Sequence, residues 1–164
     1  MKALFIGGIK SGKSKNAEEF TLSHAKNKPY YLATTEFIDV EMEKKIELHK
    51  KQREDKFITL EESLHLSKNI KECDDIVVIE CISMWLNNML YHNKSHNEIF
   101  DEIDTLLFLD NSIVFVLNDV GSGIIPDNAL AREFIELSGI ISQKLASKCD
   151  EVYHTVAGIS TKIK

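Results

Sequence analysis

The residues best suited to chemistry lie near the amino end, in the segment Gly7-Gly8-Ile9-Lys10-Ser11-Gly12-Lys13-Ser14. This segment fits G-x-x-x-x-G-K-[ST], a pattern in which glycines let successive backbone N–H groups converge on phosphate oxygens. In such a loop Lys13 adds positive charge for the β- and γ-phosphates, and the Ser14 hydroxyl is a ligand for the accompanying Mg²⁺. The segment therefore predicts a nucleoside triphosphate site that uses all of its residues, with Lys13 as a catalytic cation.

The residues on either side of this loop decide between phosphate binding and a simple glycine-rich turn. Residues 3–6 form a short β-prone run before the loop, and residues 16–20 read as the beginning of a helix after it. Strand, loop and helix in that order are the context that a phosphate-binding loop requires. They favour binding over the alternative, a turn that binds nothing.

A carboxylate that would complete this site follows the run Ile76-Val77-Val78-Ile79. This β-branched run is typical of a central parallel strand that is buried on both faces, and it ends at Glu80. A triphosphate site needs a carboxylate to hold or orient the ligand shell of the metal ion, so we predict Mg²⁺ ligands at Ser14 and Glu80. The alternative is an acid that ends the strand and faces solvent.

A histidine with cations beside it lies in residues 40–53, which read as a charged helix. On a helical wheel, one narrow stripe holds Met42, Ile46, His49 and Arg53. His49 therefore faces the protein body, where a neutral imidazole is able to attack a phosphorus atom. Arg53, with the flanking Lys50 and Lys51, would stabilise phosphate charge beside it. A satisfied core or interface histidine is the alternative that the pattern leaves open.

Strands and helices are predicted to alternate along the chain. Besides the segments already named, strands are expected at residues 29–34, 57–59, 113–117 and 151–156, and helices at 61–71, 83–91, 97–109 and 129–147. This alternation predicts an α/β fold, a mostly parallel sheet with helices on both faces. Ligands of such sheets bind at the carboxyl ends of the strands. That edge would gather the phosphate-binding loop, residues 33–35, Glu80 and the loop 118–126.

Composition narrows the class of protein further. A chain of 164 residues with 43% hydrophobic residues suits one domain, which we expect to span residues 1–164. The net charge of −6 argues against a nucleic-acid partner, since phosphate backbones are normally met by a basic face. No apolar run is long enough to cross a bilayer, and the odd number of cysteines suits reduced thiols. We therefore expect a cytoplasmic protein without a membrane span.

The other histidines and the cysteines indicate no second site. His92 and His96 have i, i+4 spacing, but no third metal ligand lies near them in the sequence. Cys73, Cys81 and Cys149 are expected to be buried apolar residues rather than metal ligands. The phosphate-binding loop and the segment that carries the cation-flanked histidine thus remain the two chemical features of the chain.

The ordered motifs of the chain resemble those of one family over essentially its whole length. They are the loop Gly7–Ser14, Tyr31-Leu32-Ala33-Thr34, Asp39-x-Glu41-Met42, Ile46-x-x-His49-x-x-x-Arg53, Thr59-x-Glu61, Glu80-Cys81-Ile82, Trp85-Leu86-x-Asn88, Asn118-x-Val120-Gly121-x-Gly123-Ile124-x-Pro126, Arg132, Gln143-x-Leu145-Ala146 and Gly158-Ile159-x-x-Lys162-Ile163-Lys164. In this set the chain resembles the bifunctional adenosylcobinamide kinase / adenosylcobinamide-phosphate guanylyltransferase family of cobalamin biosynthesis. It departs from the usual residues of that family at Lys10, Phe57 and Asp119.

The resemblance implies two phosphate transfers. A nucleoside triphosphate, ATP or GTP, would phosphorylate the aminopropanol hydroxyl of the corrinoid substrate adenosylcobinamide. GMP would then pass from GTP to His49 and on to the new phosphate, with Arg53 stabilising charge on the α-phosphate. By the same resemblance, the residues around the guanine nucleotide are Ala33, Thr34, Thr35, Lys50, Lys51, Gln52, Arg53 and Glu61.

The family also implies a RecA-like P-loop fold and a homotrimer, in which the stripe that carries His49 faces a neighbouring subunit. Two other functions stay open from the sequence. One is a P-loop kinase of another small alcohol, in which His49 is only structural. The other is a nucleotide-binding switch module that has no small-molecule substrate.

Overall fold

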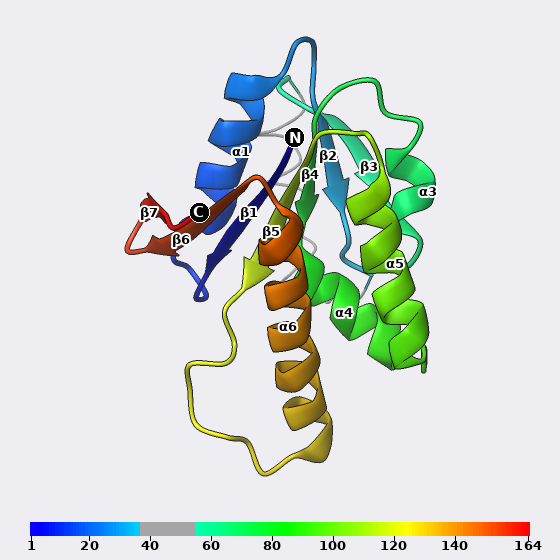
Figure 1. Cartoon of the computed structure of the whole chain (residues 1–164), viewed down its shortest axis with the longest axis vertical. Helices are drawn as coiled ribbons and strands as arrows, with labels where there is room; N and C mark the ends of the chain where they lie inside the picture. Colours follow the sequence, from blue (N-terminus) through cyan, green and yellow to red (C-terminus); the bar gives the residue numbers. More distant parts are fainter. Residues whose placement is uncertain (37–54) are drawn as a thin grey trace.

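A seven-stranded sheet forms the centre of the protein in the computed structural model, which describes residues 1–36 and 55–164. The strands are β1 (Lys2–Gly7), β2 (Tyr30–Ala33), β3 (Ile58–Glu61), β4 (Val77–Glu80), β5 (Ile113–Asn118), β6 (Glu151–Val156) and β7 (Ile159–Lys162). Their order is β3-β2-β4-β5-β1-β6-β7, and among these neighbours only β6 and β7 are antiparallel (Figure 1). The predicted α/β fold with a mostly parallel sheet is confirmed.

Helices cover both faces of this sheet. They are α1 (Lys13–His24), α3 (Leu66–Ile70), α4 (Ile82–Tyr91), α5 (His96–Phe108) and α6 (Ala129–Lys148). Successive residues of a strand point to opposite faces, so Leu4 and Phe5 of β1 enter different hydrophobic clusters. Phe5 packs in the cluster that includes Ala17 of α1, and Leu4 packs in the cluster that includes residues of α3, α4, α5 and α6.

The central strands β4 and β5 are buried on both faces, which the continuous β-branched run of residues 76–79 predicted for β4. Val77, Val78 and Ile79 are all buried, although they alternate between the two clusters. The single tryptophan, Trp85 of α4, is also buried and donates its indole N–H to the carbonyl oxygen of Leu64 at 2.9 Å. A polar group on a buried ring thus has its partner, and the ring fixes α4 against the connection between β3 and α3.

The helix expected at residues 61–71 was predicted too long. Glu61 ends β3, and α3 begins only at Leu66. The Glu62 carboxylate explains the difference, because it accepts hydrogen bonds from the backbone N–H groups of Leu64 (2.9 Å) and His65 (3.0 Å). A side chain that binds the backbone two and three residues onward stabilises a turn in place of helix.

The sequence prediction also missed the last strand, because it ended the sheet at residue 156. Ala157 (φ 51°) and Gly158 (φ 84°) both have positive φ and form a tight turn that returns the chain as β7. Two-residue hairpin turns need positive φ at their central positions, which glycine adopts readily but alanine does not. Because alanine is not a typical residue at such a position, the sequence did not predict the hairpin.

Two further predictions concern burial and membranes. Cys73 and Cys149 are buried as expected, whereas Cys81 is only partly buried, and these three thiols are free. Among the described residues, no helix combines the length and the apolar character that a bilayer crossing requires. The helix predicted for residues 40–53 lies outside the described residues.

Candidate active site

The phosphate-binding loop connects the carboxyl end of β1 to the first turn of α1, as the sequence predicted. Gly12 precedes the helix with φ 95°, a left-handed conformation that favours glycine. Lys13 is only 6% exposed, and its Nζ donates to the carbonyl oxygen of Gly8 at 3.3 Å. The ammonium group is therefore already held against the loop whose N–H groups would receive phosphate.

The two predicted metal ligands lie side by side. The hydroxyl of Ser14 on α1 donates to Oε1 of Glu80 at the end of β4, at 2.7 Å. Strand β5 lies between β4, which carries Glu80, and β1, which leads to the loop. Ser14 Oγ and the Glu80 carboxylate therefore come together because α1 packs across this face of the sheet. A hydroxyl and a carboxylate are the hard oxygen ligands that Mg²⁺ prefers.

Two more of the predicted residues share one row of the sheet with Glu80. Ala33 of β2 pairs in register with Glu61 of β3 on one side and with Glu80 of β4 on the other. Residues in one row of a parallel sheet place their side chains on the same face. Ala33 packs with the cluster that includes Ala17 of α1, so this row borders the face that the phosphate-binding loop and α1 cover.

Thr34 is a predicted nucleotide residue whose side chain has a different partner. It is fully buried, and its hydroxyl accepts from the backbone N–H of Cys81 at 3.0 Å and lies 2.9 Å from the carbonyl oxygen of Cys81, to which it donates. The side chain therefore fixes the backbone directly after Glu80. A contact between Thr34 and a nucleotide stays a prediction, as does that of the partly exposed Thr35.

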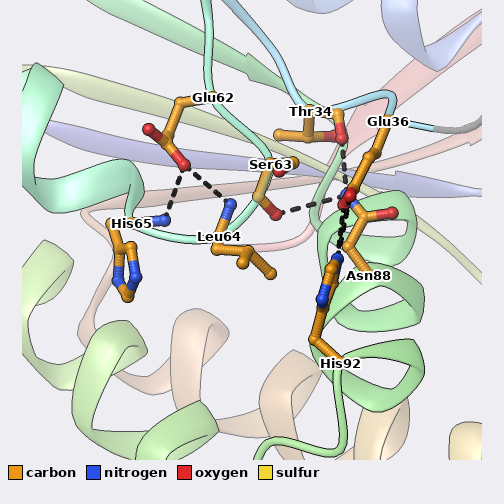
Figure 2. A network of polar contacts seen from close by, with 8 residues as sticks. All are labelled: Thr34, Glu36, Glu62, Ser63, Leu64, His65, Asn88 and His92. Carbon is orange, nitrogen blue, oxygen red and sulfur yellow. Dashed lines mark hydrogen bonds and ion pairs between the residues drawn. The ribbon is translucent and has the colours of Figure 1, made fainter.

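Asn88 of α4 is a residue whose role the sequence reasoning missed. Figure 2 shows this buried amide reaching two loops, because its Nδ2 donates to the carbonyl oxygens of Thr34 (2.6 Å) and Ser63 (3.2 Å). One turn further along, Nε2 of His92 lies 2.8 Å from a carboxylate oxygen of Glu36. Helix α4 thus holds residues 34–36, which lead directly to residue 37. In the sequence, Asn88 is only a member of the motif Trp85-Leu86-x-Asn88, which does not indicate its partners.

The histidines at positions 92 and 96 do not share a site. His96 lies 2.8 Å from a carboxylate oxygen of Glu133 on α6, whereas His92 pairs with Glu36. In the part of the chain that the structure describes, no group of three or more His, Cys, Asp or Glu side chains is arranged to hold a metal ion.

The thiol next to Glu80 is not a suitable nucleophile. Burial, together with the nearby Glu80 carboxylate, raises the pKa of the Cys81 thiol to about 12. A thiol attacks only as the thiolate, so Cys81 is unreactive at neutral pH. Burial also raises the pKa of Cys149 to about 12 and that of Cys73 to about 11.

The comparisons with known proteins agree with this geometry. A family model described as "Cobinamide kinase / cobinamide phosphate guanyltransferase" matches residues 3–163. The chain belongs to this family. It is 36% identical over 183 residues to "Bifunctional adenosylcobalamin biosynthesis protein CobU" of Salmonella typhimurium, covering 100% of both chains. It is 31% identical over 170 residues to "Bifunctional adenosylcobalamin biosynthesis protein CobP" of Pseudomonas aeruginosa, covering 100% of this chain and 98% of that one.

Membership in the cobinamide kinase / cobinamide phosphate guanyltransferase family confirms the resemblance and the enzyme class predicted from the sequence. A solved structure supports the fold alone. The chain matches a type III secretion system ATPase with a TM-score of 0.54 and 10% identity, covering 98% of this chain and 56% of that one. The P-loop α/β prediction is therefore confirmed as well.

The other residues predicted for this family's site are His49, Lys50, Lys51, Gln52 and Arg53, which lie outside the described residues. Their roles stay predictions. The described residues directly before this segment are 34–36, and α4 and His92 hold them through Thr34 and Glu36.

The carboxyl-terminal hairpin supports the phosphate-binding loop, which the sequence did not predict. The backbone N–H of Gly158 donates to the carbonyl oxygen of Ser11 at 2.7 Å. The side-chain amide of Asn16 donates to the carbonyl oxygen of Gly158 (3.1 Å) and to Oγ of Ser160 (2.7 Å). The turn between β6 and β7 therefore packs directly on the loop and on the first turns of α1.

We expect Gly12→Ala to weaken nucleotide binding. A Cβ at this position would lie 2.9 Å from Cα of Gly158, and the residue would have to keep φ near +95°. Backbone strain of this kind costs about 1–3 kcal/mol, which the loop would relieve by moving away from its phosphate-binding shape. Titration with a fluorescent GTP analogue should show a higher Kd, and thermal unfolding should show a lower Tm.

The matched control is Gly139→Ala on α6, where an added Cβ meets no atom within 4 Å. This change should preserve nucleotide affinity and stabilise the helix by about 1 kcal/mol. If Gly12→Ala and wild type bound GTP equally well, the claim that the contact between the loop and the hairpin determines the shape of the loop would be wrong.

Proposed function

We propose that this chain phosphorylates adenosylcobinamide and then transfers GMP from GTP to the product, giving adenosylcobinamide-GDP. One observation carries the proposal: a family match over residues 3–163 coincides with an assembled phosphate site, in which Ser14 Oγ lies 2.7 Å from Glu80.

In the first transfer, the loop amides and Lys13 would hold the β- and γ-phosphates of the nucleotide. The aminopropanol hydroxyl attacks the γ-phosphorus, the bond to the β,γ-bridging oxygen breaks, and the nucleoside diphosphate leaves with that oxygen. Lys13 suits this step because its ammonium group is buried and already lies against the loop, so little reorganisation accompanies the transfer. The sequence leaves ATP and GTP both possible as donors for this step.

Mg²⁺ fits the site, and Ser14 and Glu80 would hold it. Both are oxygen ligands, they already lie within hydrogen-bonding distance of each other, and Ser14 directly follows Lys13. When bound, the ion supplies positive charge to the phosphate oxygens. The buried Oγ of Ser11, which has no hydrogen-bond partner among the described residues, is a further polar atom at the loop.

In the second transfer, an imidazole nitrogen of His49 attacks the α-phosphorus of GTP, and the bond to pyrophosphate breaks. A phosphate oxygen of the corrinoid product then attacks the same phosphorus, and the imidazole leaves. Arg53, Lys50 and Lys51 would neutralise charge on the α-phosphate during both steps. The nucleotide would otherwise be contacted by Ala33, Thr34, Thr35, Gln52 and Glu61.

The proposal also includes the assembly and the location of the enzyme. A homotrimer of a single 164-residue domain follows from the family resemblance. A cytoplasmic location is supported by the free thiols of Cys73, Cys81 and Cys149.

A product analysis tests the proposal. Wild-type protein with cobinamide and ATP or GTP should yield cobinamide phosphate, and GTP alone should then convert it to the GDP conjugate with one pyrophosphate released. Mass spectrometry distinguishes the products. Accumulation of cobinamide phosphate without the GDP conjugate would support the simple kinase. Nucleotide hydrolysis at a rate that does not depend on the corrinoid would support the switch module.

A further inference from the structure

A groove of about 610 Å³ lies between α4 and α6, and the phosphate chemistry described above does not use it. Apolar side chains line it from both helices, including Leu90 and Tyr91 of α4 and Leu130 and Phe134 of α6. Tyr91 is 64% exposed and Leu130 is 60% exposed, so apolar surface here faces solvent. Exposed apolar surface gathered in one concave place indicates a binding site.

One wall of the groove begins at the phosphate site, because α4 directly follows Glu80 and Cys81. The backbone N–H of Asn118, which pairs in register with Gly7 of the phosphate-binding loop, donates to Oγ of Ser83 at 2.8 Å and so ties the first turn of α4 to this edge of the sheet. The other wall, α6, begins at Ala129, after the loop of residues 119–128.

The groove lies further out along the same edge of the sheet. Figure 1 shows the amino end of α6, and the loop before it, beyond the carboxyl ends of the strands. The rise of an α-helix places Tyr91 roughly 15 Å along α4 from Cys81. A ligand in the groove must therefore be large, or must carry a long arm, for one of its atoms to reach the phosphate-binding loop.

The lining is neutral and carries amides. Its polar members are the asparagines Asn87 and Asn128, and none of its side chains is charged. On the loop that leads into α6, Ile124 and Ile125 are also strongly exposed. The fitting ligand is broad and mostly apolar, and it carries uncharged groups that hydrogen-bond to amides.

We propose that this groove binds the corrin macrocycle of adenosylcobinamide, with the aminopropanol arm directed toward the phosphate-binding loop. This inference rests on the proposed function. A corrin ring is a wide, largely apolar disc with carboxamide arms, so it matches both the apolar walls and the asparagines without needing a cation. The α4 wall runs from Glu80 of the phosphate site to the groove, which a ligand shared by the two places requires and a contact between subunits does not.

Leu130→Asp tests this assignment, because it places a carboxylate among the apolar lining. Quenching of Trp85, the only tryptophan in the chain, reports binding of cobinamide. The Kd for cobinamide should rise by about tenfold or more, since a charge would be buried against the ligand. Affinity for a fluorescent GTP analogue should stay unchanged.

Two further variants keep the result interpretable. Ala131→Phe fills the groove without adding charge or a second tryptophan, and it should weaken cobinamide binding in the same way. Ile140→Asp introduces the same carboxylate on an exposed part of α6 outside the lining, so it should bind cobinamide like wild type. Thermal unfolding of each variant checks that it is folded.

Wild-type affinity for cobinamide in both Leu130→Asp and Ala131→Phe would overturn the assignment. The assignment would also be overturned if these variants changed the mass of the assembly, measured by light scattering, but not the affinity for cobinamide. The groove would then be a contact between copies of the chain. The proposed function fails by a different result: cobinamide binds, and Leu130→Asp weakens its binding, yet wild type forms no phosphorylated product.

Discussion

Lys13→Ala is expected to lower the rate of cobinamide phosphorylation by about a hundredfold or more, equivalent to roughly 3 kcal/mol of transition-state stabilisation. The ammonium group is almost fully buried and lies 3.3 Å from the carbonyl oxygen of Gly8, so the protein positions it before the nucleotide arrives. Removing it takes away a buried side-chain cation that would neutralise the negative charge developing on the phosphates during transfer. Initial rates with cobinamide and saturating ATP or GTP measure the effect.

The matched control is Lys15→Ala, one residue past Ser14. Lys15 is exposed and lies 3.8 Å from Glu19 on the outer side of the same helix, a surface ion pair that contributes little. This variant should phosphorylate cobinamide at the wild-type rate. A wild-type rate in Lys13→Ala as well would contradict the assignment of Lys13, and an unchanged Tm in both variants would exclude misfolding as the cause of any loss.

The parts of the fold that the sequence predicted correctly are those specified by local pattern. Runs such as residues 76–79 and 113–117 are apolar without interruption and rich in β-branched residues, and burial on both faces of a central strand favours that composition. The phosphate-binding loop is equally local, because two glycines, a lysine and a serine at fixed spacing carry its whole geometry. The proximity of Ser14 to Glu80 then followed from topology, since the carboxyl ends of parallel strands share one edge.

The parts that the sequence did not predict depend on contacts between distant segments. The support of Ser11 by Gly158 is a backbone hydrogen bond, and backbone groups carry no sequence signal. Asn88 belongs to a predicted helix, but its partners Thr34 and Ser63 lie in loops that only the folded sheet brings to it. The hydrogen bonds between the Thr34 hydroxyl and the backbone of Cys81 also join segments distant in the sequence, and the predicted contact of Thr34 with a nucleotide stays a prediction.

His49→Ala is expected to abolish the second activity and to spare the first. Wild-type protein incubated with GTP labelled at the α-phosphate should acquire a label that is stable in alkali and lost in acid, as a phosphorus–nitrogen bond requires. In the variant, no nitrogen is in place to displace pyrophosphate. Guanylyl transfer should therefore fall by about a thousandfold or more, the scale seen when a covalent nucleophile is removed.

Phosphorylation of cobinamide should continue in His49→Ala, because Lys13, Ser14 and Glu80 are unchanged and already assembled. The matched control is His96→Ala, which removes an exposed histidine that pairs with Glu133. His96→Ala should acquire the label from the α-phosphate as wild type does. GTP labelled at the γ-phosphate should label neither His96→Ala nor wild type. An adduct that persists in His49→Ala would assign the nucleophile to another side chain. Loss of both activities would instead mean that the histidine is needed to form the nucleotide site itself, and the division into two chemically separate steps would be wrong.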